Sequence, residues 1–319
     1  MFEDILVSVS VAATPLLVAA MGEVITERSG VLNLGVEGMM IMGAVTGFGV
    51  ALTTGSPWLG FLAAAAVGAL FSLLFGFLTL TLVTNQVATG LALTLLGLGL
   101  SGMLGEAFVG QPGVKLGAIH IPGLSDLPYV GKLLFGQDPM FYLSILLTVG
   151  VALFLFRTRA GLTLRSVGDN HGSAHALGIS VIGIRYLAVM FGGACAGLAG
   201  AYLSLVVTTQ WIENMTAGKG WIALALVVFA SWRPGRVLVG AYLFGAVTMA
   251  QLHIQATNFE FLPGWLAWLG TAIKSVPSQL LSSLPYLATV IVLVLISRNR
   301  RLTMVNTPAS LGRPFVPDR

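Results

Sequence analysis

Charged residues are scarce in this chain. Lys, Arg, Asp and Glu make up 9% of its 319 residues, whereas a soluble domain has roughly 25%. Hydrophobic residues make up 56%, and the mean hydropathy is +0.92. A soluble protein of this length needs charge to cover its surface, so the composition excludes that class and indicates a membrane protein.

Cysteine is nearly absent, and the common catalytic motifs are missing. Cys195 is the single cysteine, so the chain contains no disulfide pair. There is no G-x-x-x-x-G-K-[ST] phosphate loop, no H-E-x-x-H motif and no G-x-S-x-G nucleophile elbow. His171 and His175 have the i,i+4 spacing of metal ligands, but Asp169 is the one obvious acidic partner, and we interpret them as solvated histidines. We expect no enzymatic activity, cofactor or metal in this chain.

The sequence instead contains long runs without charged residues. The longest extends from Gly38 to Gly105. A helix crosses the hydrocarbon layer with about 20 apolar residues, and a span in lipid must satisfy its own backbone hydrogen bonds. The alternating segments of a membrane β-barrel are not seen. We therefore predict an all-α polytopic integral membrane protein with about nine transmembrane helices, in the range of eight to ten. They are placed at 5–21, 31–52, 59–83, 87–109, 140–156, 186–208, 220–232, 237–257 and 284–297.

The basic residues indicate an orientation. If the N-terminus lies outside, all twelve arginines fall on the inside and the four lysines fall outside. Positive residues concentrate on the cytoplasmic side of membrane proteins. We therefore expect an N-terminus outside the cytoplasmic (inner) membrane and a C-terminus in the cytoplasm. We interpret the basic residues, despite a pI near 9.5, as topology signals and not as a nucleic-acid surface.

The predicted domain organisation is simple. Residues 1–297 form one transmembrane domain, with a Pro- and Gly-rich external loop at 110–139 and an internal loop at 157–185. A long ordered loop is often functional, so the external loop is either a docking surface or a connector. Residues 298–319 are expected to be a disordered cytoplasmic tail.

The internal loop contains a predicted short helix. Asp169 or Asn170 is a suitable N-cap for residues 172–177, and Gly178 is a suitable left-handed C-cap. A short capped helix on the inner face is suited to a groove in another protein. The alternative is a plain loop that carries positive charge.

The stretch G22-EVITERSGVLNLGVEGMMIM-G43 places charge and glycine inside apolar sequence. Glu23 and Glu27 share one helix face at i,i+4, where like charges are mildly unfavourable. Arg28 can relieve this, so we predict structural ion pairing among these three residues near the inner surface.

Glu37 is different, because it falls about six residues into the second predicted span. An ionised group there is costly and should face the protein interior or a water-filled path. Gly35 and Gly38 permit a broken span, whose free backbone groups Asn33 and Glu37 can bond. These four residues are assigned to the translocation path or its gate. The alternatives are helix–helix bonding that scaffolds the gate, direct solute contact, or an interfacial cap.

Two further polar residues lie in a late span. Gln251 and Gln255 share a face and can hydrogen-bond a nucleobase or a sugar, although such residues more often bridge helices. We assign them to the path as well.

Several motifs resemble those of one transporter superfamily. The run G-L-T-L-R-S-V-G-D-N…A-L-G-I-S…G-L-A-G over 161–200 resembles the cytoplasmic coupling region of ABC-importer permeases of the ribose and branched-chain amino acid superfamily. The stretch G-E-x-I-x-E-R-S-G-V-x-N-L-G-x-E-G-M-M resembles the nucleoside branch, whose partners are basic membrane proteins. Further matches are I-P-G-L-S-D-L-P at 121–128, A-G-K-G-W-I-A-L-A at 217–225 and P-Y-L-A-T at 285–289.

This resemblance implies an ABC-importer permease fold and a mechanism. A separate ATPase pair binds ATP-Mg and drives alternating access, an extracytoplasmic binding protein delivers the solute, and two permease chains, often different ones, form the path through the membrane lipid. The implied solutes are nucleosides or related purine and pyrimidine compounds. The helix that contacts the ATPase groove would involve Arg165, Asp169, Asn170, Ala174, Leu177 and Gly178.

Three alternatives remain at this point. The same mechanism could serve a sugar such as ribose or a branched-chain amino acid. A stand-alone secondary transporter or channel would need its own ion site, and the intramembrane acids are few. A membrane-embedded enzyme has no catalytic residues to support it.

Overall fold

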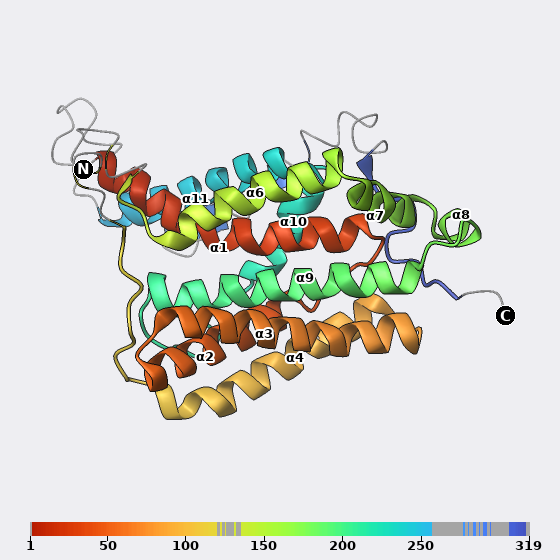
Figure 1. Cartoon of the computed structure of the whole chain (residues 1–319). Helices are drawn as coiled ribbons and strands as arrows, with labels where there is room; N and C mark the ends of the chain where they lie inside the picture. Colours follow the sequence, from red (N-terminus) through yellow and green to blue (C-terminus); the bar gives the residue numbers. More distant parts are fainter. Residues whose placement is uncertain are drawn as a thin grey trace.

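The computed structural model describes residues 2–119, 135–256 and 306–316, with isolated positions between these ranges. This part of the chain is built from helices, and its one β-bridge joins Val109 to Trp211. The helices run side by side, with the N-terminus at one end of the bundle and the described C-terminal residues at the other (Figure 1). The predicted all-α membrane fold is confirmed.

Ten α-helices are described. They are α1 (Phe2–Arg28), α2 (Val36–Thr54), α3 (Pro57–Gly76), α4 (Gln86–Gly105), α6 (Pro139–Arg157), α7 (Arg159–Asp169), α8 (His171–Ala176), α9 (Val181–Tyr202), α10 (Lys219–Phe229) and α11 (Pro234–Ala256). Helices α3 and α9 each continue into a π-helical turn, at Phe77–Thr81 and Leu203–Val207, and α4 continues into a 3₁₀ turn at Glu106–Phe108.

Seven of the described helices are long and apolar enough to cross a membrane: α1, α2, α3, α4, α6, α9 and α11. They match seven of the nine predicted spans, so the count of nine is not confirmed. The eighth prediction, 220–232, corresponds to α10, which has 11 residues and is about 16 Å long at 1.5 Å per residue. That length crosses only about half of the hydrocarbon layer. The ninth prediction, 284–297, lies outside the described ranges.

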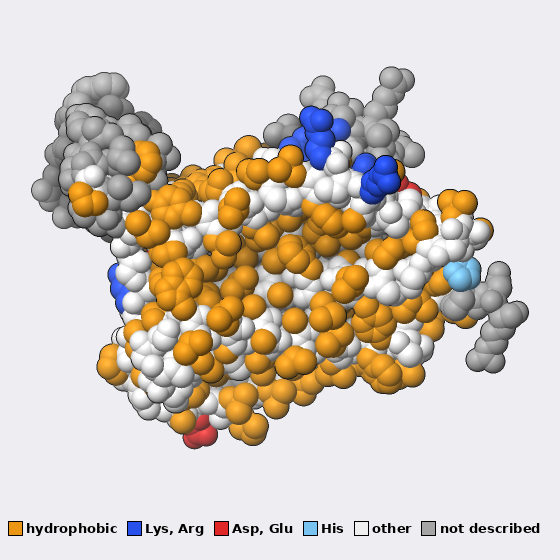
Figure 2. Space-filling model, in the orientation of Figure 1, with side chains coloured by type: hydrophobic (Ala, Val, Ile, Leu, Met, Phe, Trp, Pro, Cys, Tyr) orange, Lys and Arg blue, Asp and Glu red, His pale blue; other side chains and the backbone are white. Residues whose placement is uncertain are grey.

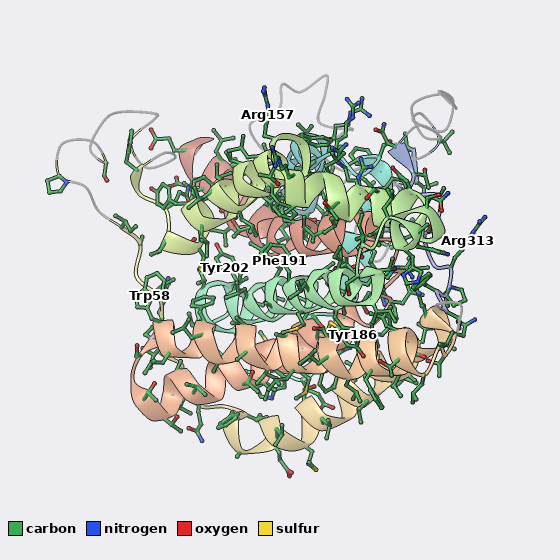
Figure 3. The ribbon with its side chains drawn as sticks, turned by 45° about the vertical axis from the view of Figure 1, so that its right-hand side comes forward. Trp58, Arg157, Tyr186, Phe191, Tyr202 and Arg313 are labelled. Carbon is green, nitrogen blue, oxygen red and sulfur yellow. The ribbon has the colours of Figure 1, made fainter. Side chains whose placement is uncertain are left out.

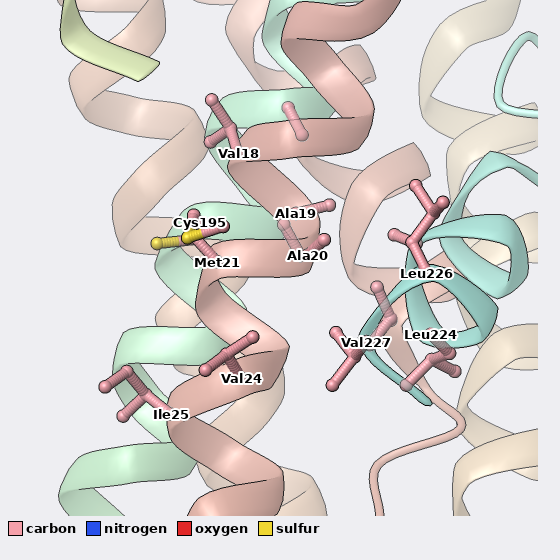
Figure 4. Packing of buried hydrophobic residues seen from close by; sticks show 14 of the residues in the cluster. Val18, Ala19, Ala20, Met21, Val24, Ile25, Cys195, Leu224, Leu226 and Val227 are labelled. Atoms are coloured by element: carbon pink, nitrogen blue, oxygen red, sulfur yellow. The ribbon is translucent and has the colours of Figure 1, made fainter. Parts of the chain in front are cut away.

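Helix α9 lies at the centre of the bundle, in contact with α1, α2 and α3 (Figure 1). Small residues allow these helices to approach closely. A side chain added at Gly193 or Gly197 would overlap the backbone of α3. On the other side of α1 lies α10, and Figure 4 shows the apolar side chains packed along α1 between α9 and α10. The spans α1, α2 and α9 are consequently the most deeply buried.

The outer surface of the bundle is apolar. Figure 2 shows hydrophobic side chains covering the face along α6 and the helices below it, with Lys and Arg gathered at the end where α7 begins. Leu146, Val149 and Leu153 of α6 are 50–67% exposed. A belt of this kind suits contact with lipid, because lipid tails are as apolar as the side chains.

Candidate functional site: the half-helix α10 and the end formed by α7 and α8

The chain between α1 and α2 is irregular although it is buried. Backbone polar groups inside a membrane protein must find partners within the protein. The side chain of Asn33 accepts from Gly35 N–H at 3.0 Å, Gln86 Oε1 accepts from Leu32 N–H at 2.8 Å, and Thr94 donates to Leu34 C=O at 3.1 Å. These bonds hold the irregular segment before α2, and the helix of the second predicted span begins only at Val36.

Glu37 lies in the first turn of α2, yet its carboxylate bonds to α10. Its two oxygens accept from Gly218 N–H at 2.9 Å and from Gly220 N–H at 2.7 Å. The first N–H groups of a helix have no partner within the helix, and the helix dipole makes this end favourable for an anion. Glu37 is 2% exposed and therefore caps α10 inside the protein.

The other end of α10 is bonded by residues from the end of α1. After α10 ends, Ser231 and Trp232 have positive φ values of 51° and 55°. The indole N–H of Trp232 donates to Glu27 at 2.5 Å, and the guanidinium of Arg28 donates to the Trp232 carbonyl at 3.2 and 3.4 Å. A cation suits the carbonyl-rich end of a helix. We call Glu37, Glu27, Arg28 and Trp232 the α10 clamp.

The α10 clamp differs from the predicted ion pairing of Glu23, Glu27 and Arg28. All three residues are at most 6% exposed and do not lie in open water at the inner surface. Among the described residues Arg28 forms no ion pair with either glutamate and bonds to Trp232 instead. Glu23 accepts from Asn33 over a long 3.4 Å, and its other oxygen has no hydrogen-bond partner in the described part. Arg28 donates to the carbonyl group of Trp232 after the end of α10 and therefore does not pair with Glu23 or Glu27.

A cavity of about 640 Å³ opens beside the N-terminal end of α10. Thr94 and Leu98 of α4 line one side, and Trp221 of α10 lines the other, with Asn214 and Glu37 between them. The indole of Trp221 is 46% exposed. One apolar ring, one amide and one hydroxyl can stack on and hydrogen-bond a small uncharged solute, since both oxygens of Glu37 already accept N–H groups.

The helix pair α7 and α8 forms one end of the bundle (Figure 1). Thr158 caps α7 by accepting from Gly161 N–H, and Asn170 caps α8 by accepting from Ser173 N–H at 2.9 Å. Gly178 follows with φ of 79°. The predicted short capped helix is confirmed, with Asn170 as its cap. Ala174 is buried and Leu177 is 81% exposed, so the helix has one packed and one free side.

The described C-terminal residues, 306–316, pack on this same end, and we call them the C-terminal strap. Ser310 N–H donates to Gly168 C=O at 2.8 Å, and Gly312 N–H donates to Gly30 C=O at 3.1 Å. The ring of Phe315 lies 5.2 Å from that of His171 and 5.3 Å from that of His175. The expected disordered tail, 298–319, thus includes a segment with defined partners.

Arg185 joins the strap to the rest of this end. It is 1% exposed, and its guanidinium donates to Ser29 C=O, to Arg313 C=O and to His171 Nδ1, each at 3.2 Å. The last bond requires a neutral His171. Burial, and then the charges of Arg185 and Arg313, lower the pKa of His171. Arg313 lies at the same edge of the bundle in Figure 3.

The remaining predicted site residues lie apart. Arg165 on α7 sits with its guanidinium 5.3 Å from the Phe156 ring, and Asp169 is exposed at the end of α7. Gln251 lies on α11, which packs against α1, and it does not line the cavity beside α10. The side chain of Gln255 lies outside the described residues.

Sequence reasoning missed three kinds of residue in this region. Gly218 and Gly220 supply the N–H groups for Glu37, Trp232 supplies the indole, and Arg185 holds the strap. A signal existed for the first, because A-G-K-G precedes a predicted span of unusually short length. The bond from Trp232 to Glu27 spans 205 positions, and the bond from Arg185 to Arg313 in the strap spans 128 positions, so no local pattern indicates them.

The family model for the branched-chain amino acid transport system / permease component matches residues 5–297. A putative glucose ABC transporter permease protein, TsgC13 of Haloferax volcanii, is 44% identical over 289 residues, which is 88% of each chain. The nucleoside ABC transporter permease protein NupC of Lactococcus lactis is 34% identical over 91% of each chain.

A third relative is the guanosine ABC transporter permease protein NupQ of Bacillus subtilis, at 33% identity over 96% of this chain and 94% of its own. No solved structure matches the chain significantly. The family match covers nearly the whole length, and it includes α7, α8 and the α10 clamp. This protein is a member of the branched-chain amino acid transport system permease family, the membrane-spanning components of ABC transporters.

Proposed function

We propose that this chain is the membrane subunit of an ATP-driven importer for a nucleoside or a sugar. The observation that carries the proposal is that relatives covering about nine tenths of the chain are ABC transporter permease proteins, one for glucose and two for nucleosides. ATP hydrolysis is assigned to a partner, since the sequence has no phosphate loop.

The cavity beside α10 suits such solutes. A ribose or hexose ring, or a nucleobase, can lie on the exposed indole of Trp221 and bond to Asn214 and Thr94. Glu37 is the one carboxylate among the described lining residues, and its two oxygens are used to accept the N–H groups of Gly218 and Gly220. Trp221, Ala225 and Val228 form an open face of α10 at helical spacing. A second permease chain opposite this face would complete the path.

Coupling to the ATPase is assigned to the end formed by α7 and α8. Asn170 and Gly178 define α8, Ala174 anchors it, and Leu177 presents an apolar side chain outward. Such a helix fits a groove in a partner. Arg28, Arg157, Arg159, Arg165, Arg185 and Arg313 belong to this end, which supports its placement in the cytoplasm. The N-terminus and the external loop then face an extracytoplasmic binding protein.

Reconstitution tests the proposal. The chain is placed in liposomes with candidate ATPase, binding-protein and second-permease subunits, and uptake of labelled guanosine, ribose and glucose is measured with and without ATP. We expect ATP-dependent uptake of one of these classes. Uptake without ATP, or a chain that binds no ATPase subunit, would contradict an importer and favour a secondary transporter.

Two variants test the coupling end in the same assay. Arg165→Glu and Ala174→Pro should retain membrane insertion and ATPase binding while uptake per ATP hydrolysed falls at least tenfold. Proline removes an N–H that α8 bonds, Ala174 N–H to Asn170 C=O at 3.0 Å. Leu146→Ala on the outer face of α6 serves as the control. Normal coupling in both variants would show that this end has no such role.

A further inference from the structure

An apolar groove lies on the outer surface between α6 and α9, close to the end where α7 begins. Its volume is about 450 Å³, within the roughly 300–1,000 Å³ of small-molecule sites. It is lined by hydrophobic side chains and one glycine, among them Leu147, Gly150, Phe154, Leu164, Ile184 and Phe191. Figure 3 shows Phe191 in the space between α6 and α9. We call it the α6–α9 groove.

The surroundings of the groove are those of a lipid-facing surface. The α6 face next to it carries Leu146, Val149 and Leu153, and Leu187 on α9 is 67% exposed. An atom added at Gly150 meets nothing within 4 Å. Because hydrophobic side chains are abundant on this face and no Lys, Arg, Asp or Glu is visible across its middle (Figure 2), the natural occupant of the groove is a flexible hydrocarbon chain.

Two exposed arginines lie at one end of the groove. Arg157 follows Phe154 by three residues on α6, and Arg159 precedes Ala160, another lining residue, on α7. Both arginines are exposed, and Figure 3 shows Arg157 extending away from the bundle at the end of α6. Guanidinium groups bind phosphate with two hydrogen bonds, and basic residues next to a membrane attract anionic lipids.

We propose that the α6–α9 groove binds an anionic phospholipid, with one acyl chain along Gly150 and Phe154 and the phosphate on Arg157 and Arg159. An acyl chain gains little from leaving other lipid tails, so affinity rests on close packing in the groove and on the charge at its end. The acyl chain also contacts Leu164, a buried residue of α7 that lines the groove. The bound lipid thus supports α7, the helix that leads to α8.

Lipid retention tests this proposal on the whole purified chain. The protein is exchanged into a mild detergent with equal amounts of phosphatidylglycerol and phosphatidylcholine that carry identical acyl chains, and bound lipids are counted by native mass spectrometry. We expect a preference for phosphatidylglycerol of roughly tenfold to thirtyfold, the effect of two cations near an anionic headgroup. Equal retention of the two lipids overturns the proposal.

Three variants separate the two parts of the site. Arg157→Gln with Arg159→Gln should abolish the preference and leave neutral-lipid binding intact, because it changes only exposed side chains. Gly150→Phe should fill the groove and remove one bound lipid of either kind. Gly99→Phe, at another open glycine on α4, is the matched control and should retain wild-type binding. Unchanged retention in Gly150→Phe would show that lipid does not occupy the groove.

Discussion

Replacing Glu37 by glutamine should release the N-terminal end of α10. The carboxylate accepts from Gly218 N–H and Gly220 N–H at 2.9 and 2.7 Å. A hydrogen bond to a charged group contributes about 1.5–3 kcal/mol. Glutamine keeps one acceptor oxygen but points its NH₂ group at the second N–H, which loses that bond and leaves a buried donor without a partner. We expect a loss of about 2–4 kcal/mol in the free energy of unfolding.

The assay is thermal unfolding of the purified chain in detergent, followed by ATP-dependent uptake in the complete transporter. A loss of that size lowers the unfolding temperature by roughly 3–6 °C, because the entropy of unfolding is about 2.1 cal/mol/K per residue and the shift shrinks as the chain lengthens. Glu23→Gln is the matched control, because Glu23 is equally buried, on the neighbouring α1, and one of its oxygens has no partner among the described residues. Its change should be small.

Two results would refute this reasoning. If Glu37→Gln unfolds at the wild-type temperature, Glu37 does not hold α10 in the folded protein. If Glu23→Gln is the more damaging variant, the important carboxylate is the one near Asn33, and the hydrogen bonds to Gly218 and Gly220 contribute little.

The other predictions concern the clamp and the strap. Trp232→Phe removes the indole N–H that Glu27 accepts and should cost about 1.5–3 kcal/mol of stability in thermal unfolding; an unchanged unfolding temperature would contradict the bond. Gly220→Ala places a Cβ atom 2.7 Å from the Cα atom of the capping glutamate and should cost about 1–3 kcal/mol, whereas Gly99→Ala, at an open position, should cost much less. The lowered pKa of His171 on α8 means that this histidine binds a proton more readily when the strap is released than when the strap packs against it, so docking of the strap should weaken as pH falls below 6.5. A spin label on the strap should then become more mobile in the wild type but show no such pH dependence in His171→Gln.

Much of the fold could be predicted from the sequence because it depends on local composition. The charge-free run from Gly38 to Gly105 contains three of the confirmed spans almost entirely. The cap at Asn170 and the turn at Gly178 follow from the conformations that these two residue types favour. Each of these features depends on residues that lie close together in the sequence.

The half-helix could not be predicted in the same way. Its 11 residues are as apolar as a full span, and hydropathy alone does not indicate where such a helix stops. The partners of its two ends, Glu37 and Arg28, lie about 180 and 200 positions away in the chain. Polar residues of this kind show that a partner exists, but only the tertiary structure identifies it. The strap is similar, because its bonds to Gly30 and Gly168 are made by backbone atoms.

Cysteine accessibility tests most directly whether α10 lines the path of the solute. The native Cys195 is buried, so cysteines introduced as Trp221→Cys and Ala225→Cys report on their own sites in the complete transporter. A membrane-impermeant thiol reagent should label both, and the transported nucleoside or sugar should protect them, while Leu146→Cys on the outer face of α6 should resist labelling. Absence of labelling at both α10 positions, or labelling that the solute does not reduce, would contradict the account.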